Sequence, residues 1–282
     1  MVLEWITNPV KAERRPYTMF FIGILYSSLA ILLSQWIFYN EASLVMIFLT
    51  VIASMPLIYS TIKLEEKKDK MIHKEIVLLK EHGRALAFFM YLFLGFTVSF
   101  AMWYVFLPSA TVQNLFSTQT QTYLSINTNI TGNVAKLGLL GKIFFNNLKV
   151  LMFCVLFSFL YGVGSIFILT WNASVLGVAI GNFIRTRISD YADAAHLAKA
   201  AGYFHIFSLG LLRYAIHGIP EILSYFVGGL AGGIISIAVI RHDFGSRNFE
   251  HIVLDSSELL LISFLLLTLA AFLEVYVTPI IF

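Results

Sequence analysis

Long apolar runs separated by short polar segments dominate the first half of the chain. Three of these runs, Tyr17–Phe38, Ser43–Ile62 and Ala85–Leu107, reach the length of about 20 residues that a helix needs to cross a bilayer. The short link Tyr39–Ala42 predicts that the first two form an antiparallel hairpin. Because the first run has full spanning length, we expect it to be retained as a signal anchor.

The second half contains two longer apolar stretches, Lys149–Ile184 and His205–Ile240, each about 36 residues long and so too long for one span and short for two. The first is interrupted by polar residues at 170–174 and the second at His217–Pro220. Discontinuous and re-entrant membrane helices have this pattern, and their unpaired backbone must be buried in protein or reached by water. We therefore expect two breaks that face each other. The residues expected at the breaks are Gly177, Gly181, Gly218 and Pro220.

A last apolar run, Leu259–Val277, completes the set of predicted spans. The expected fold is all-α: a polytopic transmembrane helical bundle with about six spans, two of them broken or re-entrant.

Glycines recur at four-residue spacing in the last third of the chain. Gly228 pairs with Gly232, and Gly229 pairs with Gly233. Such small-xxx-small pairs allow another helix to approach closely. We expect helix packing within the chain here, with a homodimer as the alternative.

The distribution of charge predicts the topology. Residues 63–84 contain seven of the 19 Lys and Arg residues, so the positive-inside rule places this loop and the basic N-terminus in the cytoplasm of a cell-membrane, multi-pass protein. The Ser/Thr/Asn-rich segment Ser109–Gly141 should face outside, where Asn129 lies in a glycosylation acceptor sequence. Arg185 favours a cytoplasmic position for the connector Ile184–Phe204.

The composition agrees with a membrane location. Hydrophobic residues make up 59% of the chain and charged residues 12%, with a mean hydropathy of +0.82, which leaves too little polar surface for a soluble domain. A net charge of +3 is too slight for a nucleic-acid-binding surface. Cys154 is the single cysteine, so the chain cannot form an internal disulfide or a cysteine metal cluster.

Ionisable residues interrupt the apolar stretch around position 217. Arg213, His217 and Glu221 are four residues apart and would share one face of a helix. Charged groups at membrane depth are costly and usually paired or functional. Arg213 is the expected partner of Glu221 or Glu274. Three interpretations remain open: a buried ion-pair or hydrogen-bond network, a transport site, and a metal-dependent catalytic site, although no known hydrolase motif is completed.

Several short motifs in the second half resemble the stage II sporulation protein M family. They are Asn147 before a span, Asn172 leading into Gly177 and Gly181, His217-Gly218 with Glu221 before a glycine-rich helix, and Glu274 near Thr278-Pro279. Ala173 departs from the pattern, since the family usually has glycine there.

The resemblance divides the chain into two parts. Residues 85–282 form the family-like membrane core, and residues 1–84 form an extra transmembrane hairpin with a charged cytoplasmic helix. For endospore-forming bacteria, the resemblance implies a membrane scaffold for peptidoglycan-degrading enzymes during engulfment. The composition is compatible with an archaeal member.

The leading interpretation is therefore a membrane scaffold or assembly factor without enzymatic activity. The alternative is a small solute or ion transporter or channel, and a weaker one is an intramembrane metal-dependent hydrolase. We expect the lipid bilayer and a membrane protein as partners, and no nucleic acid, cofactor or bound metal. The candidate polar intramembrane site comprises Asn147, Asn172, Arg213, His217, Glu221 and Glu274.

Overall fold

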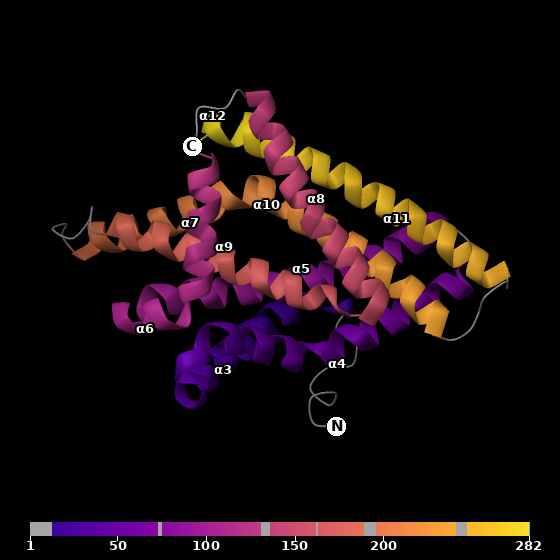
Figure 1. Cartoon of the computed structure of the whole chain (residues 1–282), viewed down its shortest axis with the longest axis horizontal. Coiled ribbons are helices and arrows are strands. Elements are labelled where there is room, and N and C mark those ends of the chain that lie inside the picture. The colour runs from indigo at the N-terminus through magenta and orange to yellow at the C-terminus, as the bar shows by residue number, and fades with distance from the viewer. Residues whose placement is uncertain are drawn as a thin grey trace.

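A computed structural model describes residues 13–72, 75–130, 136–161, 163–188, 196–240 and 247–281. Throughout these ranges the regular elements are helices, which confirms the predicted all-α polytopic bundle (Figure 1). Seven helices are long and apolar enough to span a membrane.

The helices follow one another with short connections. Their bounds are α3 (Thr18–Ile37), the 3-10 turn η1 (Tyr39–Glu41), α4 (Ala42–Met71), α5 (Glu75–Phe106), α6 (Ser109–Leu115), α7 (Ser117–Ile130), α8 (Lys136–Tyr161), α9 (Ser165–Ile188), α10 (His196–Ile240), α11 (Arg247–Phe272), the π-helix η3 (Leu273–Val277) and α12 (Thr278–Ile281).

The first long apolar stretch of the second half belongs to two helices, and the predicted position of its break is wrong. Helix α8 ends at Tyr161 and α9 begins at Ser165, whereas Asn172 lies inside α9. The chain turns at Gly164, where an added Cβ would collide with the backbone carbonyl of Phe157. Because α8 and α9 each span, the bundle has seven candidate spans instead of about six.

The second long stretch is one continuous helix, so the predicted break at its centre is also wrong. Helix α10 runs for 45 residues and includes both Gly218 and Pro220. A bilayer strongly favours a helix because its backbone N–H and C=O groups are hydrogen-bonded within the helix. A proline is accommodated in such a helix because neighbouring helices can satisfy the backbone groups that it leaves unpaired. Gly177 and Gly181 are likewise helical, within α9.

Glycines instead mark close helix contacts. A Cβ at Gly177 would lie 2.6 Å from the Cβ of Phe100 on α5, so α9 packs tightly there. On α10, a Cβ at Gly232 would lie 2.6 Å from the carbonyl oxygen of Val155 on α8. Gly228 and Gly229 approach α8 and α9 in the same way.

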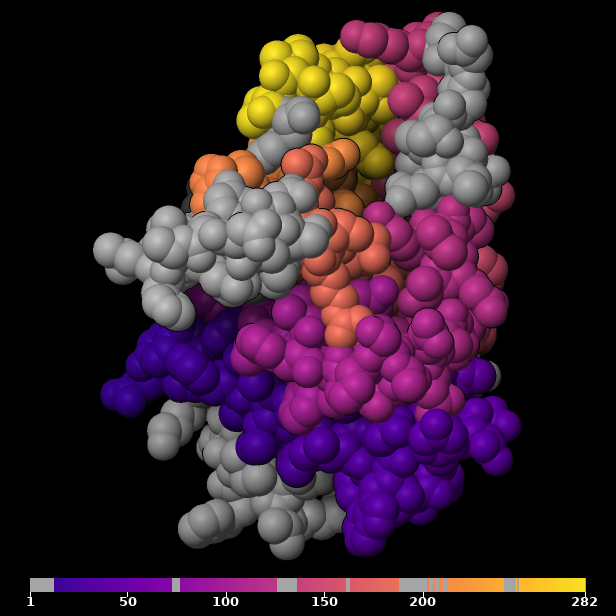
Figure 2. All heavy atoms as spheres, turned by 90° about the vertical axis from the view of Figure 1, so that its left-hand side faces the viewer, coloured from indigo at the N-terminus to yellow at the C-terminus, as the bar shows by residue number. Residues whose placement is uncertain are grey.

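The C-terminal end of α9 lies at the opposite end of the bundle from the lysine-rich segment 63–84, which belongs to the end of α4 and the start of α5. Arg185 donates hydrogen bonds to the carbonyls of Val105 and Leu107, where α5 ends. Figure 2 looks onto this end, where α6 and α7 fill the surface between α3–α4 and the C-terminal helices. The expectation that the chain leaves α9 on the same side as the 63–84 segment is therefore wrong, because the extra span reverses the chain once more; residues 189–195 of the connector itself lie outside the described residues.

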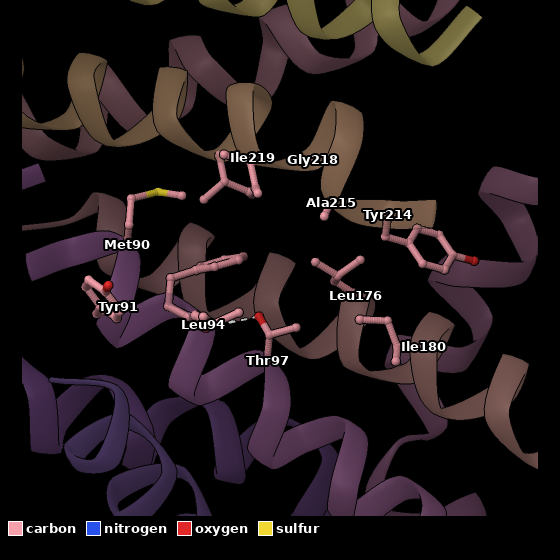
Figure 3. A pocket seen from close by; sticks show the side chains of 12 residues that line it. Met90, Tyr91, Leu94, Thr97, Leu176, Ile180, Tyr214, Ala215, Gly218 and Ile219 are labelled. Atoms are coloured by element: carbon pink, nitrogen blue, oxygen red, sulfur yellow. Dashed lines mark hydrogen bonds between the residues drawn. The ribbon is translucent and has the colours of Figure 1, made fainter. Parts of the chain in front are cut away.

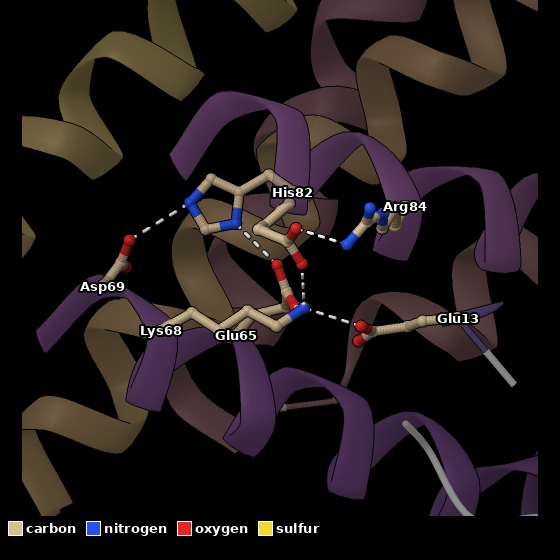
Figure 4. A network of polar contacts seen from close by, with 7 residues as sticks. Glu13, Glu65, Lys68, Asp69, His82 and Arg84 are labelled. Carbon is tan, nitrogen blue, oxygen red and sulfur yellow. Dashed lines mark hydrogen bonds and ion pairs between the residues drawn. The ribbon is translucent and has the colours of Figure 1, made fainter. Parts of the chain in front are cut away.

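A buried charge network joins the other ends of α4 and α5 (Figure 4). Lys68 Nζ lies 2.6 Å from both Glu13 Oε2 and Glu65 Oε1. His82 Nδ1 lies 2.7 Å from Glu65 Oε2, and its Nε2 lies 3.1 Å from Asp69 Oδ1. Since both ring nitrogens face carboxyl oxygens, both can donate only if the ring is protonated. This network anchors the segment before α3 to the α4–α5 pair.

Candidate functional site

A polar cavity of about 250 Å³ lies among α8, α9, α10 and the π-helix η3. Five of the six predicted site residues line it, although they are spread over more than 120 positions of the sequence. The lining residues are Lys142, Ile143, Asn146, Asn147, Val150, Asn172, His217, Glu221, Tyr225 and Glu274.

Two carboxyl groups face this cavity from different helices. Glu221 is on α10, where the hydroxyl of Tyr225, one turn later, donates to its Oε1 over 2.9 Å. Glu274 is the second residue of the π-helix Leu273–Val277. A π-turn holds one residue more than an α-turn and so changes the direction of the side chains that follow, and such turns are frequent at functional sites. Within the described residues, neither carboxyl group forms an ion pair.

His217 connects α10 to the C-terminal end of the chain. Its Nδ1 lies 3.2 Å from Thr278 Oγ1, and the Thr278 hydroxyl donates to the carbonyl oxygen of Leu273 over 3.1 Å. Because that hydroxyl proton is used, Thr278 accepts from Nδ1–H, which leaves Nε2 as an acceptor in the neutral ring.

The asparagines add further acceptors. Asn172 Nδ2 donates one hydrogen to the carbonyl oxygen of Ile168 within α9 over 2.8 Å, which leaves Oδ1 and the second amide hydrogen for other partners. Asn147 on α8 is 8% exposed. Asn146 donates to Asn147 Oδ1 over a long 3.5 Å, so that contact holds the Asn147 side chain only weakly.

Arg213 does not take the predicted role. It is exposed on α10 and does not line the cavity, and within the described residues no ion pair joins it to Glu221 or Glu274. Among the groups that share a helical face, His217 and Glu221 point into the cavity, and Arg213 lies beyond it.

Three polar lining residues were not predicted from the sequence. Tyr225 continues the four-residue spacing of His217 and Glu221, and this spacing could have identified it. Lys142 and Asn146 are also four residues apart, one turn before the apolar part of α8. The sequence feature that could have identified them is a pair of polar residues on one helical face just before an apolar run.

A larger apolar groove lies on the other side of α10 (Figure 3). It has a volume of about 370 Å³ and is lined mainly by apolar side chains of α5, α9 and α10, among them Leu94, Leu176 and Ile219. Its Thr97 hydroxyl already donates to the carbonyl oxygen of Phe93. Tyr91 and Tyr214 add two hydroxyl groups, but no carboxyl, imidazole or side-chain amide lines the groove, which makes the cavity the candidate site for a polar ligand.

Other predicted sites can be placed only in part. Over the described ranges, no group of three or more His, Cys, Asp or Glu side chains is arranged to hold a metal ion. Asn129 lies on α7, but its side chain is outside the described residues.

The comparisons with known proteins identify a family. Residues 85–279 match the family model described as Stage II sporulation protein M, as the motifs had indicated. The match begins within α5 and includes every residue that lines the polar cavity. The comparisons with curated proteins and with solved structures give no match.

Proposed function

The chain belongs to the stage II sporulation protein M family, an integral membrane family, and from its polar cavity we propose that it binds a small polar solute inside the bilayer, as a transporter or channel does. We further propose that it resides in the cell membrane with its N-terminus in the cytoplasm, on the strength of the lysine-rich 63–84 segment.

One observation supports solute binding most strongly: polar side chains from three helices and the π-helix converge on a single cavity at membrane depth. Glu221 and Glu274 would be costly there if nothing contacted them. A purely structural network would pair them with a cation of the protein. Within the described residues, neither the exposed Arg213 nor Lys142, which lines the same cavity, forms an ion pair with them.

Family membership favours a second candidate, a membrane scaffold or assembly factor that holds a protein partner. On that hypothesis the cavity is a packing feature, and the function depends on the outer surface of the bundle. The two candidates predict different effects for a change confined to the cavity.

The test is native mass spectrometry of the gently solubilised protein beside the variants Glu221→Gln and Glu250→Gln. Glutamine keeps the volume of glutamate, and Glu250 is an exposed residue of α11 away from the cavity, so it serves as the matched control. A solute-binding protein should retain a small molecule in the parent and in Glu250→Gln, and lose it in Glu221→Gln.

The opposite result would be a protein without a small molecule in all three forms that keeps the same protein partner throughout. That result would replace the solute-binding proposal with the scaffold. Thermal unfolding of each variant shows whether Glu221→Gln retains the fold, since leaving a buried hydrogen-bonding group unsatisfied can cost about 1–3 kcal/mol.

A further inference from the structure

From the donors and acceptors of the polar cavity, we infer that its ligand is a small organic cation carrying an ammonium group. This inference rests on the proposed function and specifies the class of solute.

The first step is the count of free acceptors. Asn172 has used one of its two amide hydrogens on Ile168, and its side-chain oxygen remains as an acceptor. In the neutral ring His217 presents Nε2, since Thr278 accepts from Nδ1–H. Glu221 and Glu274 add carboxyl oxygens. A ligand that satisfies these groups must be rich in hydrogen-bond donors.

The second step is the charge. When ionised, Glu221 and Glu274 contribute negative charge to the cavity. Lys142 also lines the cavity, and within the described residues it pairs with neither carboxyl group. A cationic ligand would offset the negative charge, which lowers the cost of charge at this depth.

The third step is the size. A cavity of about 250 Å³ holds more than one water-sized group, so a small organic cation fits it. Within the described residues, the carboxyl groups are also not part of a cluster of three or more side chains that could hold a metal ion. The three donors of an ammonium group suit acceptors that lie on separate helices.

The experiment measures thermal unfolding of the reconstituted full chain with four probes: n-butylammonium, butyramide, butyrate and magnesium ion. The first three share a similar carbon chain and differ in charge and donors. We expect n-butylammonium alone to raise the unfolding midpoint, by roughly 2–4 °C at saturating concentration. The shift should vanish in Glu221→Gln and in Glu274→Gln and persist in Glu250→Gln.

The outcomes separate the inference from the proposed function. A midpoint raised by butyrate or butyramide, and not by n-butylammonium, would overturn the cationic ligand while leaving solute binding intact. Stabilisation by magnesium alone would replace the organic cation with a metal. If no probe shifts the midpoint and native mass spectrometry finds no small molecule, both proposals fail.

Discussion

Two glycines of α10 have opposite surroundings although they share one helix. A Cβ at Gly218 would have no atom within 4 Å, because the residue borders the apolar groove. A Cβ at Gly232 would lie 2.6 Å from a backbone oxygen of α8, which cannot move aside like the end of a flexible side chain. The sequence shows the same residue type at both positions, and only the packing distinguishes them.

We predict that Gly218→Ala stabilises the protein by about 0.5–1 kcal/mol, because alanine is the better helix former and meets no obstacle. Gly232→Ala should destabilise it by about 1–3 kcal/mol, since α8 and α10 must separate. Thermal unfolding in one detergent compares the two directly. A midpoint that falls equally in both variants would contradict the difference in packing.

The candidate site shows what residue patterns can reveal. Unusual polar residues in apolar runs led to His217, Glu221, Asn147, Asn172 and Glu274, and the fold gathers them around one cavity. Sequence spacing gives no distances between side chains on different helices. The predicted pairing of Arg213 with Glu221 or Glu274 was therefore wrong.

At the scale of elements, the described residues just before α3 dock on α4 through the buried carboxyl group of Glu13. Glu13 is 6% exposed and contacts Lys68, which also contacts Glu65 and Glu81. Burial raises the pKa of Glu13 from 4.5 to about 7, an effect that outweighs the opposing hydrogen bond to Lys68 and to which nearby Glu65 adds. His82 and Asp69 complete the charged surroundings through Glu65.

The sign of the pH effect follows from this raised pKa. Between pH 4.5 and about 7 the docked segment binds more protons than the undocked one, so docking weakens as the pH rises. We expect up to about a tenfold loss per pH unit in this window. Amide hydrogen exchange of the residues around Glu13, corrected for intrinsic rates, measures it. In Glu13→Gln this dependence should be absent, and its persistence there would assign it to another group.

Helix boundaries were predictable where hydropathy changed sharply, and less so within long apolar stretches. The hairpin of α3 and α4 lies where the Tyr39–Ala42 link predicts it. Pro220 and Gly218 indicated a break that α10 does not have, because a bilayer penalises an interrupted backbone more than these residues weaken a helix. The turn near Gly164 lacks charged residues and was therefore missed.

At the scale of the whole molecule, that missed turn changes the topology. With seven candidate spans, the Lys-rich end of α4 and the end of α9 lie at opposite ends of the bundle. An arginine beside a span therefore does not identify the cytoplasmic side when its side chain binds backbone carbonyls, as that of Arg185 does.

We predict that cysteines at Lys67 and Thr186, introduced singly, react with a membrane-impermeant thiol reagent from opposite sides of sealed vesicles. Both positions are exposed, whereas the native Cys154 is fully buried and should leave the parent chain unlabelled. Labelling of both positions from one side would restore the six-span topology.

The π-helix at Leu273–Val277 makes the polar cavity depend on the length of the chain as well as on its composition. An α-helix turns about 100° per residue, so deleting one residue from this segment would restore α-helical register and rotate Thr278 away from His217. The hydropathy profile would hardly change. Relatives of this protein that differ by a single-residue gap here could keep the bundle and every polar side chain, yet differ in whether Thr278 meets His217 beside the cavity.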